Sequence, residues 1–169
     1  LGYILQSPHL FSGTVKDNIK YGKLDASDME VISAAKIVNA YGFISKLEKG
    51  FDTEVGESGN LFSTGEKQLI SFARAVLVNP KIFVLDEATS SIDTETEQKI
   101  QDAIQTILAN RTSLIIAHRL STIRSADRIL VIKKGRITEA GNHQELLAKR
   151  GYYYELYTRQ FVRELEAAI

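Results

Sequence analysis

Cysteine is absent from the 169 residues, which excludes disulfides and thiolate metal sites. Net charge is also absent, because 21 basic residues balance 21 acidic ones, and so nothing in the composition favours nucleic acid as a partner. Apolar runs are no longer than a strand, far below the roughly 20 residues of a membrane-spanning helix. Any membrane association is therefore expected to come through a partner domain. The 44% of hydrophobic residues still allows one sizeable core.

Two adjacent acidic residues, Asp86 and Glu87, follow the apolar run Ile82–Leu85. Such a run is typical of a parallel strand covered on both faces, and the carboxyl edge of an open α/β sheet is where ligands bind. Asp86 can hold a hydrated Mg²⁺, and Glu87 can orient or deprotonate a water molecule. Alternatively, the two carboxylates only cap the next turn.

Ser63 precedes a segment whose apolar residues recur at helical spacing: Leu69, Ile70, Ala73, Val76 and Leu77. Ser63 and Glu66 fit a capping box, which would account for both residues by helix stability alone. In the functional interpretation, Gly65 lets the backbone approach an anion, and the free N–H groups of the helix start attract it.

The remaining pattern alternates helices and strands. We predict a strand over residues 1–6, helices over 14–21, 28–40 and 63–78, and then a strand to Asp86 and a helix from 94 to 108. A strand over 112–117, a short helix near Thr122 and a hairpin of 128–133 with 136–140 follow. Asn142 with Glu145 begins another capped helix, and a last helix follows Gly151.

Five motifs, whose order along the chain agrees with that family, resemble the nucleotide-binding domain of an ATP-binding cassette (ABC) transporter of the exporter type. Residues 62–66, Phe-Ser-Thr-Gly-Glu, stand where that family has its signature motif, usually LSGGQ, and residues 82–87 resemble its Walker B motif. Residues 91–93, ending in Asp93, resemble the D-loop. His118 resembles the switch histidine, and Gln6 stands at the Q-loop glutamine.

The resemblance implies an α/β fold like that of P-loop NTPases, with a parallel sheet flanked by helices and an inserted helical subdomain. Residues 1–6 and 80–169 would belong to the α/β core, and residues 7–79 to the Q-loop and helical subdomain. Residues 53–59 resemble the exporter X-loop, which in that family touches cytoplasmic loops of the membrane domain; otherwise they are a Gly-rich surface turn. Four apolar residues of the last helix form a stripe, expected to be core packing: Tyr153, Leu156, Tyr157 and Phe161.

The implied activity is ATP binding and hydrolysis that drives export across a membrane. Glu87, His118 and Gln6 would be catalytic, and Asp86 and Gln6 would lie at the Mg²⁺. A second nucleotide-binding domain would pack head to tail, so that the signature motif of one domain meets the ATP of the other. Five residues would serve this nucleotide contact: Ser63, Thr64, Gly65, Glu66 and Asp93. A transmembrane domain would hold the whole at the cytoplasmic face of the cell membrane.

The sequence departs from the family pattern at two points of the signature motif. Thr64 replaces a glycine, and Glu66 replaces a glutamine and brings a like charge toward an anion. Either Glu66 turns back onto the Ser63 N–H as a capping partner, or the departures mark the weaker of two unequal sites in a heterodimer.

The P-loop pattern GxxxxGK followed by Ser or Thr does not occur in these residues. We therefore expect a C-terminal part of a longer domain, inactive alone. Its sheet would leave Ile82 and Val84 uncovered, so that it self-associates or is only partly ordered there. Two other classes stay open: a non-transport ABC ATPase, and a non-catalytic interaction protein that lacks a P-loop.

Overall fold

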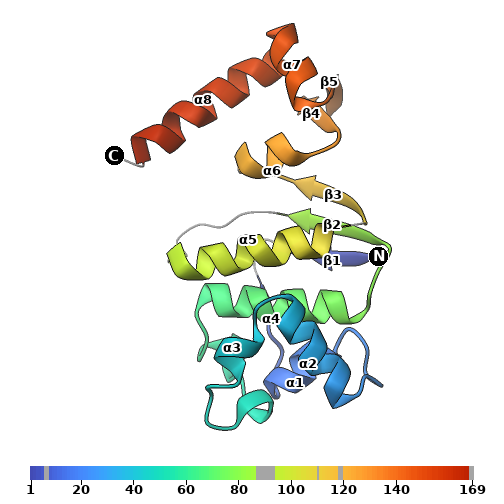
Figure 1. The fold of residues 1–169 in the computed structure, drawn as a ribbon, viewed down its shortest axis with the longest axis vertical. Coiled ribbons are helices and arrows are strands. Elements are labelled where there is room, and N and C mark those ends of the chain that lie inside the picture. The colour runs from blue at the N-terminus through green and yellow to red at the C-terminus, as the bar shows by residue number, and fades with distance from the viewer. Residues whose placement is uncertain (6–7, 87–93, 110, 118–119, 168–169) are drawn as a thin grey trace. The chain divides into compact units, whose positions relative to one another are not determined.

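A computed structural model describes residues 1–5, 8–86, 94–109, 111–117 and 120–167. The chain forms two compact units, residues 1–116 and 117–169 (Figure 1). Gln6, Glu87, Asp93 and His118 lie outside the described residues. The division at residues 7–79 that the sequence predicts stays a prediction.

A three-stranded parallel sheet lies at one side of the first unit, in the order β1 (Gly2–Ile4), β2 (Ile82–Asp86), β3 (Thr112–Ile116). The register aligns Tyr3 with Val84 and Val84 with Leu114, so these three residues share one face. The parallel sheet predicted from the sequence is thereby confirmed. The strands are shorter than expected at residues 1–6 and 112–117.

Only one face of this sheet is well covered within the described residues. Phe83 and Leu85 of β2 are buried, together with Ile104 and Ile107 of the helix α5 (Thr94–Leu108). Ile82 is 47% exposed on the opposite face, and Leu114 of β3 is 58% exposed. The apolar run of β2 therefore alternates between a buried and a partly exposed face, as the pleat of a strand requires. The predicted uncovered position of Ile82 is confirmed.

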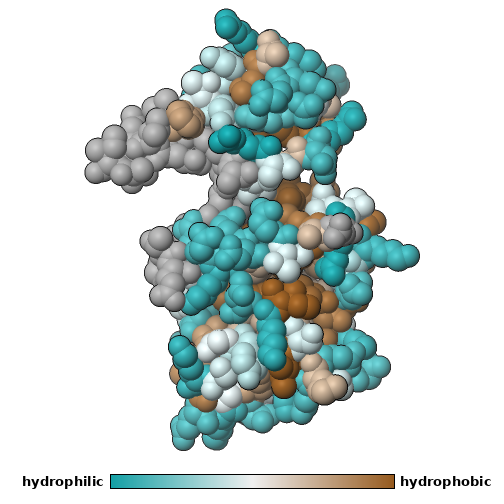
Figure 2. Space-filling view, in the orientation of Figure 1, coloured by the Kyte–Doolittle hydropathy of each residue, from teal (hydrophilic) through white to brown (hydrophobic). Residues whose placement is uncertain are grey.

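Helices form the rest of the first unit, next to α5: α1 (Val15–Lys20), α2 (Asp28–Ile37), α3 (Tyr41–Ile44) and α4 (Thr64–Leu77), with the 3-10 turns η1 (Gly50–Asp52) and η2 (Glu57–Gly59). The helix α4 packs against α1, α2, α5 and β1, which makes it the central element of this unit (Figure 1). The predicted helix over residues 28–40 ends earlier, because Asn39 takes a left-handed conformation with φ of 60°. Figure 2 shows hydrophobic surface between the hydrophilic side chains of one face.

The second unit contains α6 (Leu120–Ser125), the hairpin of β4 (Ile129–Lys133) and β5 (Arg136–Gly141), α7 (His143–Lys149) and α8 (Tyr152–Ala167). Lys134 and Gly135 both have positive φ, which suits a tight hairpin turn. The carboxylate of Glu139 in β5 accepts hydrogen bonds from the N–H groups of Tyr152 and Tyr153 and so caps α8.

The apolar stripe of α8 is core packing only in part. Tyr153 is buried and its hydroxyl lies 2.7 Å from Nδ1 of His143, while the rings of Tyr157 and Phe161 stack. Leu156 and Phe161, however, are both more than 40% exposed. No helix among the described residues is both long and apolar enough to cross a lipid bilayer.

Candidate nucleotide-binding site

The signature-like residues lie at the start of α4. Ser63 is the N-cap residue, with extended backbone (φ −62°, ψ 161°), and Thr64 is the first helical residue; both are exposed. The Ser63 hydroxyl oxygen accepts a hydrogen bond from the Glu66 N–H at 3.3 Å. One carboxylate oxygen of Glu66, Oε2, accepts from both the Ser63 N–H and the Ser63 Oγ, each at 2.9 Å. The capping box that the sequence predicts is thereby confirmed.

The N–H groups of Thr64 and Gly65 begin the helix and therefore have no acceptor within it. Together with the helix dipole they give this end a partial positive charge that favours an anion. Thr64 is exposed, whereas Gly65 is buried. An anion that approaches this end therefore meets Ser63 and Thr64 first.

The buried face of α4 keeps this helix start in place. Its apolar face is formed by Leu69, Ile70, Phe72, Ala73 and Val76, all buried in the core of the first unit. Burial of such side chains contributes on the order of 1.5–3 kcal/mol each for the larger ones. The position of Ser63 is thus determined by core packing further along the same helix.

A partly buried arginine of α4, which the sequence patterns did not single out, fixes the helix to the preceding chain. Arg74 donates from Nε to the Asn18 backbone oxygen at 2.7 Å, and from Nη2 to Asn18 Oδ1 at 3.0 Å. Its Nη1 donates to the His9 carbonyl oxygen at 3.2 Å. Burial lowers the pKa of the guanidinium. The sequence signal was a basic residue within the apolar run Phe72–Val76.

Two aromatic rings cover the guanidinium of Arg74. It lies 5.0 Å from the ring centre of Phe11 and 5.8 Å from that of Tyr21, and these two rings stack at 4.4 Å. Asn18, whose side chain accepts from the Phe11 N–H and donates to the Phe11 carbonyl, ties this arrangement to α1. Tyr21 itself is 59% exposed. The segment 9–21 and the signature-bearing helix are therefore one connected structure.

The X-loop-like residues are joined to the start of α1. Val15 N–H donates to the Thr53 carbonyl at 3.0 Å, and Val55 N–H donates to the Gly13 carbonyl at 2.9 Å. Val55 is fully buried. Gly56 has φ of +73°, and a Cβ there would meet the Asn60 side chain. The turn therefore requires glycine at this position.

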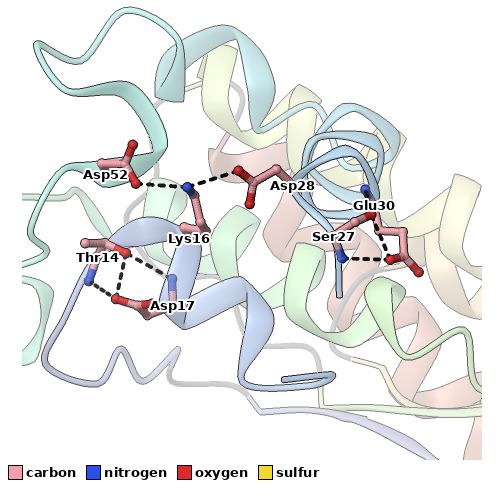
Figure 3. A network of polar contacts seen from close by, with 7 residues as sticks. All are labelled: Thr14, Lys16, Asp17, Ser27, Asp28, Glu30 and Asp52. Carbon is pink, nitrogen blue, oxygen red and sulfur yellow. Dashed lines mark hydrogen bonds and ion pairs between the residues drawn. The ribbon is translucent and has the colours of Figure 1, made fainter. Parts of the chain in front are cut away.

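A cluster of ion pairs joins α1, α2 and η1 next to the X-loop-like residues (Figure 3). Lys16 Nζ lies 3.0 Å from Asp52 and 3.4 Å from Asp28, and the hydrogen bond with Asp52 raises the pKa of this lysine. Two further capping boxes lie beside it, Thr14 with Asp17 and Ser27 with Glu30. Hydrogen bonds from Thr14 lower the pKa of Asp17. The hydrogen bond from Lys23, and to a smaller extent those from Ser27, lower the pKa of Glu30 to about 2.

The Walker B-like strand places Asp86 at the carboxyl end of β2, opposite Ile116 of β3. The three strands end at this edge shortly before Gln6, Glu87 and His118, which lie outside the described residues together with Asp93. The described residues hold no cluster of three or more potential metal ligands. Asp86 alone is still compatible with Mg²⁺, which is commonly bound by one or two carboxylates together with substrate phosphates.

A family model described as "ABC transporter" matches residues 1–90. The chain is 53% identical over 161 residues to an uncharacterized ABC transporter ATP-binding protein, YfiC, of Bacillus subtilis (strain 168), covering 95% of this chain and 27% of that one. It is 52% identical over 161 residues to an ATP-dependent lipid A-core flippase of Syntrophus aciditrophicus (strain SB), with the same coverage of 95% and 27%.

A third relative is a putative multidrug export ATP-binding/permease protein of Staphylococcus aureus (strain NCTC 8325 / PS 47), 52% identical over 160 residues, covering 95% of this chain and 28% of that one. Among solved structures, a bacterial Atm1-family ABC exporter with ATP bound matches with a TM-score of 0.84 and 46% identity, over 94% of this chain and 28% of that one.

The chain therefore belongs to the ABC transporter family, and within it to the ATP-binding domains of the exporter type. It spans about a quarter of the length of the curated relatives it matches. The fold class and the family resemblance predicted from the sequence are confirmed.

Proposed function

We propose that this chain supplies part of the ATP-hydrolysing machinery of a membrane exporter, at the cytoplasmic face of the cell membrane and joined to a transmembrane domain. The observation that carries the proposal is the placement of two motifs in one compact unit. Ser63 lies exposed at the start of the central helix α4, and Asp86 lies at the carboxyl edge of the sheet that α4 contacts through β1. The names of the flippase and the multidrug export relatives support the exporter class.

In this proposal the chain takes part in two nucleotide sites. At one, Glu87 orients the attacking water, and His118 and Gln6 hold the γ-phosphate and the water in line. At the other, residues 63–66 contact the ATP bound by a second nucleotide-binding domain packed head to tail, and Asp93 links the two sites. Phosphoryl transfer needs mainly positioning and charge stabilisation, which such a constellation provides.

Asp86 would hold Mg²⁺ together with Gln6. The ion, when bound, neutralises charge on the phosphate oxygens. Asp86 suits this role because it is the last residue of β2, paired there with Ile116 of β3, so that its carboxylate lies at the carboxyl edge of the sheet.

Glu87→Gln in the full-length transporter tests the proposal. Loss of the water-orienting carboxylate should leave ATP binding intact and lower the steady-state hydrolysis rate by about two to four decades. Glu48→Gln, at an exposed acidic residue in the turn after α3, is the matched control and should hydrolyse ATP at the rate of the unchanged protein. A Glu87→Gln rate within a factor of about two of that rate would reject Glu87 as the base.

A further inference from the structure

The capping box of α4 uses the same donors that a phosphate at this helix end would need. Glu66 Oε2 accepts from the Ser63 N–H at 2.9 Å and from the Ser63 Oγ at 2.9 Å. A serine hydroxyl has a single proton to donate. In this structure that proton is directed at the chain's own carboxylate.

We propose that Glu66 is an internal competitor of ATP at the signature motif. The inference rests on the proposed function, in which Ser63 contacts the nucleotide of the partner domain. A phosphate oxygen can accept the Ser63 proton only when the Glu66 carboxylate gives it up. The Glu66 carboxylate and a phosphate that binds the same Ser63 hydroxyl would also repel each other, so that the carboxylate must turn away before the phosphate binds.

The surroundings of Glu66 permit this exchange. Ser63 and Thr64 are exposed and Glu66 is partly exposed, so the carboxylate can move into solvent without meeting the core. The helix itself is held by its buried face, from Leu69 to Val76, and does not depend on the cap for its position. A phosphate would also satisfy the helix N-terminus that the carboxylate leaves. The exchange therefore replaces one anion by another at the same helix end.

Glutamine at position 66 would remove this competition. Glutamine can still close a capping box, so the helix start should persist. It carries no charge, however, and its amide N–H₂ can donate to a phosphate oxygen. With glutamate at this position, the half-saturating ATP concentration of the site is therefore higher than it would be with glutamine.

The chain offers a matched control in the capping box of α2 (Figure 3). There, Ser27 N–H and Ser27 Oγ donate to Glu30 Oε2 at 2.8 and 2.9 Å, and Glu30 N–H donates to Ser27 Oγ at 3.3 Å. This geometry is almost the same as that of Ser63 and Glu66. Glu30 begins a different helix and has no place in the proposed nucleotide sites.

The test measures the half-saturating Mg-ATP concentration of the full-length transporter for four variants. Glu66→Gln should lower it about tenfold, since a like charge close to the phosphate is removed. Glu66→Ala should lower it as well, although it also removes the cap. Glu30→Gln should leave it unchanged. For Ser63→Arg, the trapping of ATP is measured as a second readout, and it should be abolished at the site formed with the partner domain.

Three outcomes would overturn the inference. If Glu66→Gln and Glu66→Ala keep the original half-saturation while Ser63→Arg abolishes trapping, Glu66 is no competitor, although the proposed site stands. If Glu30→Gln has the same effect as Glu66→Gln, the cause is a general change in helix capping. If Ser63→Arg leaves trapping unchanged, the signature motif does not bind nucleotide, and the proposed function fails together with the inference.

Discussion

The guanidinium of Arg74 donates to both oxygens of Asn18, the backbone carbonyl at 2.7 Å and the side-chain amide oxygen at 3.0 Å. The two residues are 56 positions apart in the sequence. This pair joins the helix that carries the signature motif to α1 and to the segment after the Q-loop position. A substitution at either residue should therefore lower the local stability of both elements.

Arg74→Ala should destabilise this junction by about 2–4 kcal/mol, because it removes three charge-assisted hydrogen bonds, of which the two to Asn18 are partly buried. Hydrogen exchange of the full-length protein should then speed up in peptides covering residues 8–22. Arg159→Ala, which truncates an exposed arginine of α8, should leave that exchange unchanged. Equal exchange in both variants would mean that the pair carries no local stability.

Gly22→Ala should destabilise the same junction by a steric route. A Cβ at Gly22 would lie 2.6 Å from the Arg74 carbonyl oxygen and 2.8 Å from Val78 Cγ2, too close for either to stay in place. We expect a loss of about 1–3 kcal/mol, typical of overpacking. Urea-dependent hydrogen exchange of the α1 and α4 amides measures it.

Gly42→Ala is the matched control for this substitution. A Cβ there would meet no atom within 4 Å, and Gly42 lies in the helix α3. Alanine should therefore be neutral or stabilise this helix by up to about 1 kcal/mol. A Gly22→Ala protein as stable as Gly42→Ala would show that the backbone contact at Arg74 relaxes freely.

The second unit should lose stability in mildly acidic solution through His143. Burial, followed by the nearby charge of Arg124, lowers the pKa of His143 below its usual 6.5. A histidine with a lowered folded-state pKa binds protons more readily when unfolded, so stability is full above about pH 6.5 and falls as the pH drops below it.

Hydrogen exchange of the α7 and α8 amides between pH 5.5 and 7.5, corrected for intrinsic rates, measures this loss. His143→Gln should flatten the dependence, since glutamine does not titrate. Asp17 and Glu30 do not interfere in this pH range. Because folding lowers the pKa of both carboxyl groups, the stability that they contribute is lost only when the pH falls below about 4.5. An unchanged slope in His143→Gln would reject His143 as the source.

Substitutions at Ser63 and His118 should impair different nucleotide sites in the full-length transporter. In the proposed arrangement, Ser63→Arg places a bulky side chain at the helix end that would meet the partner's ATP, whereas His118→Ala would affect the ATP of its own domain. In a heterodimer, a photoreactive nucleotide should therefore label different subunits in the two mutants. The same labelling pattern in both would contradict the head-to-tail arrangement.

The sequence by itself determined the local structure. The capping boxes at Ser63 and Asn142 could be predicted because the partners lie three residues apart, and so their hydrogen bonds depend on little beyond the local backbone. The apolar run of β2 likewise predicted a parallel strand. The motif order predicted the family, since five patterns in one order constrain a chain far more than one.

Only the tertiary structure decided the relationships between distant segments. No local pattern announces that Arg74 meets Asn18, or that residues 53–55 pair with residues 13–15, because these contacts depend on how the helices pack. The exposure of Ile82 likewise depends on what the packed chain leaves uncovered. Propensity and periodicity describe one element at a time, whereas burial and long-range hydrogen bonds are properties of the packed chain.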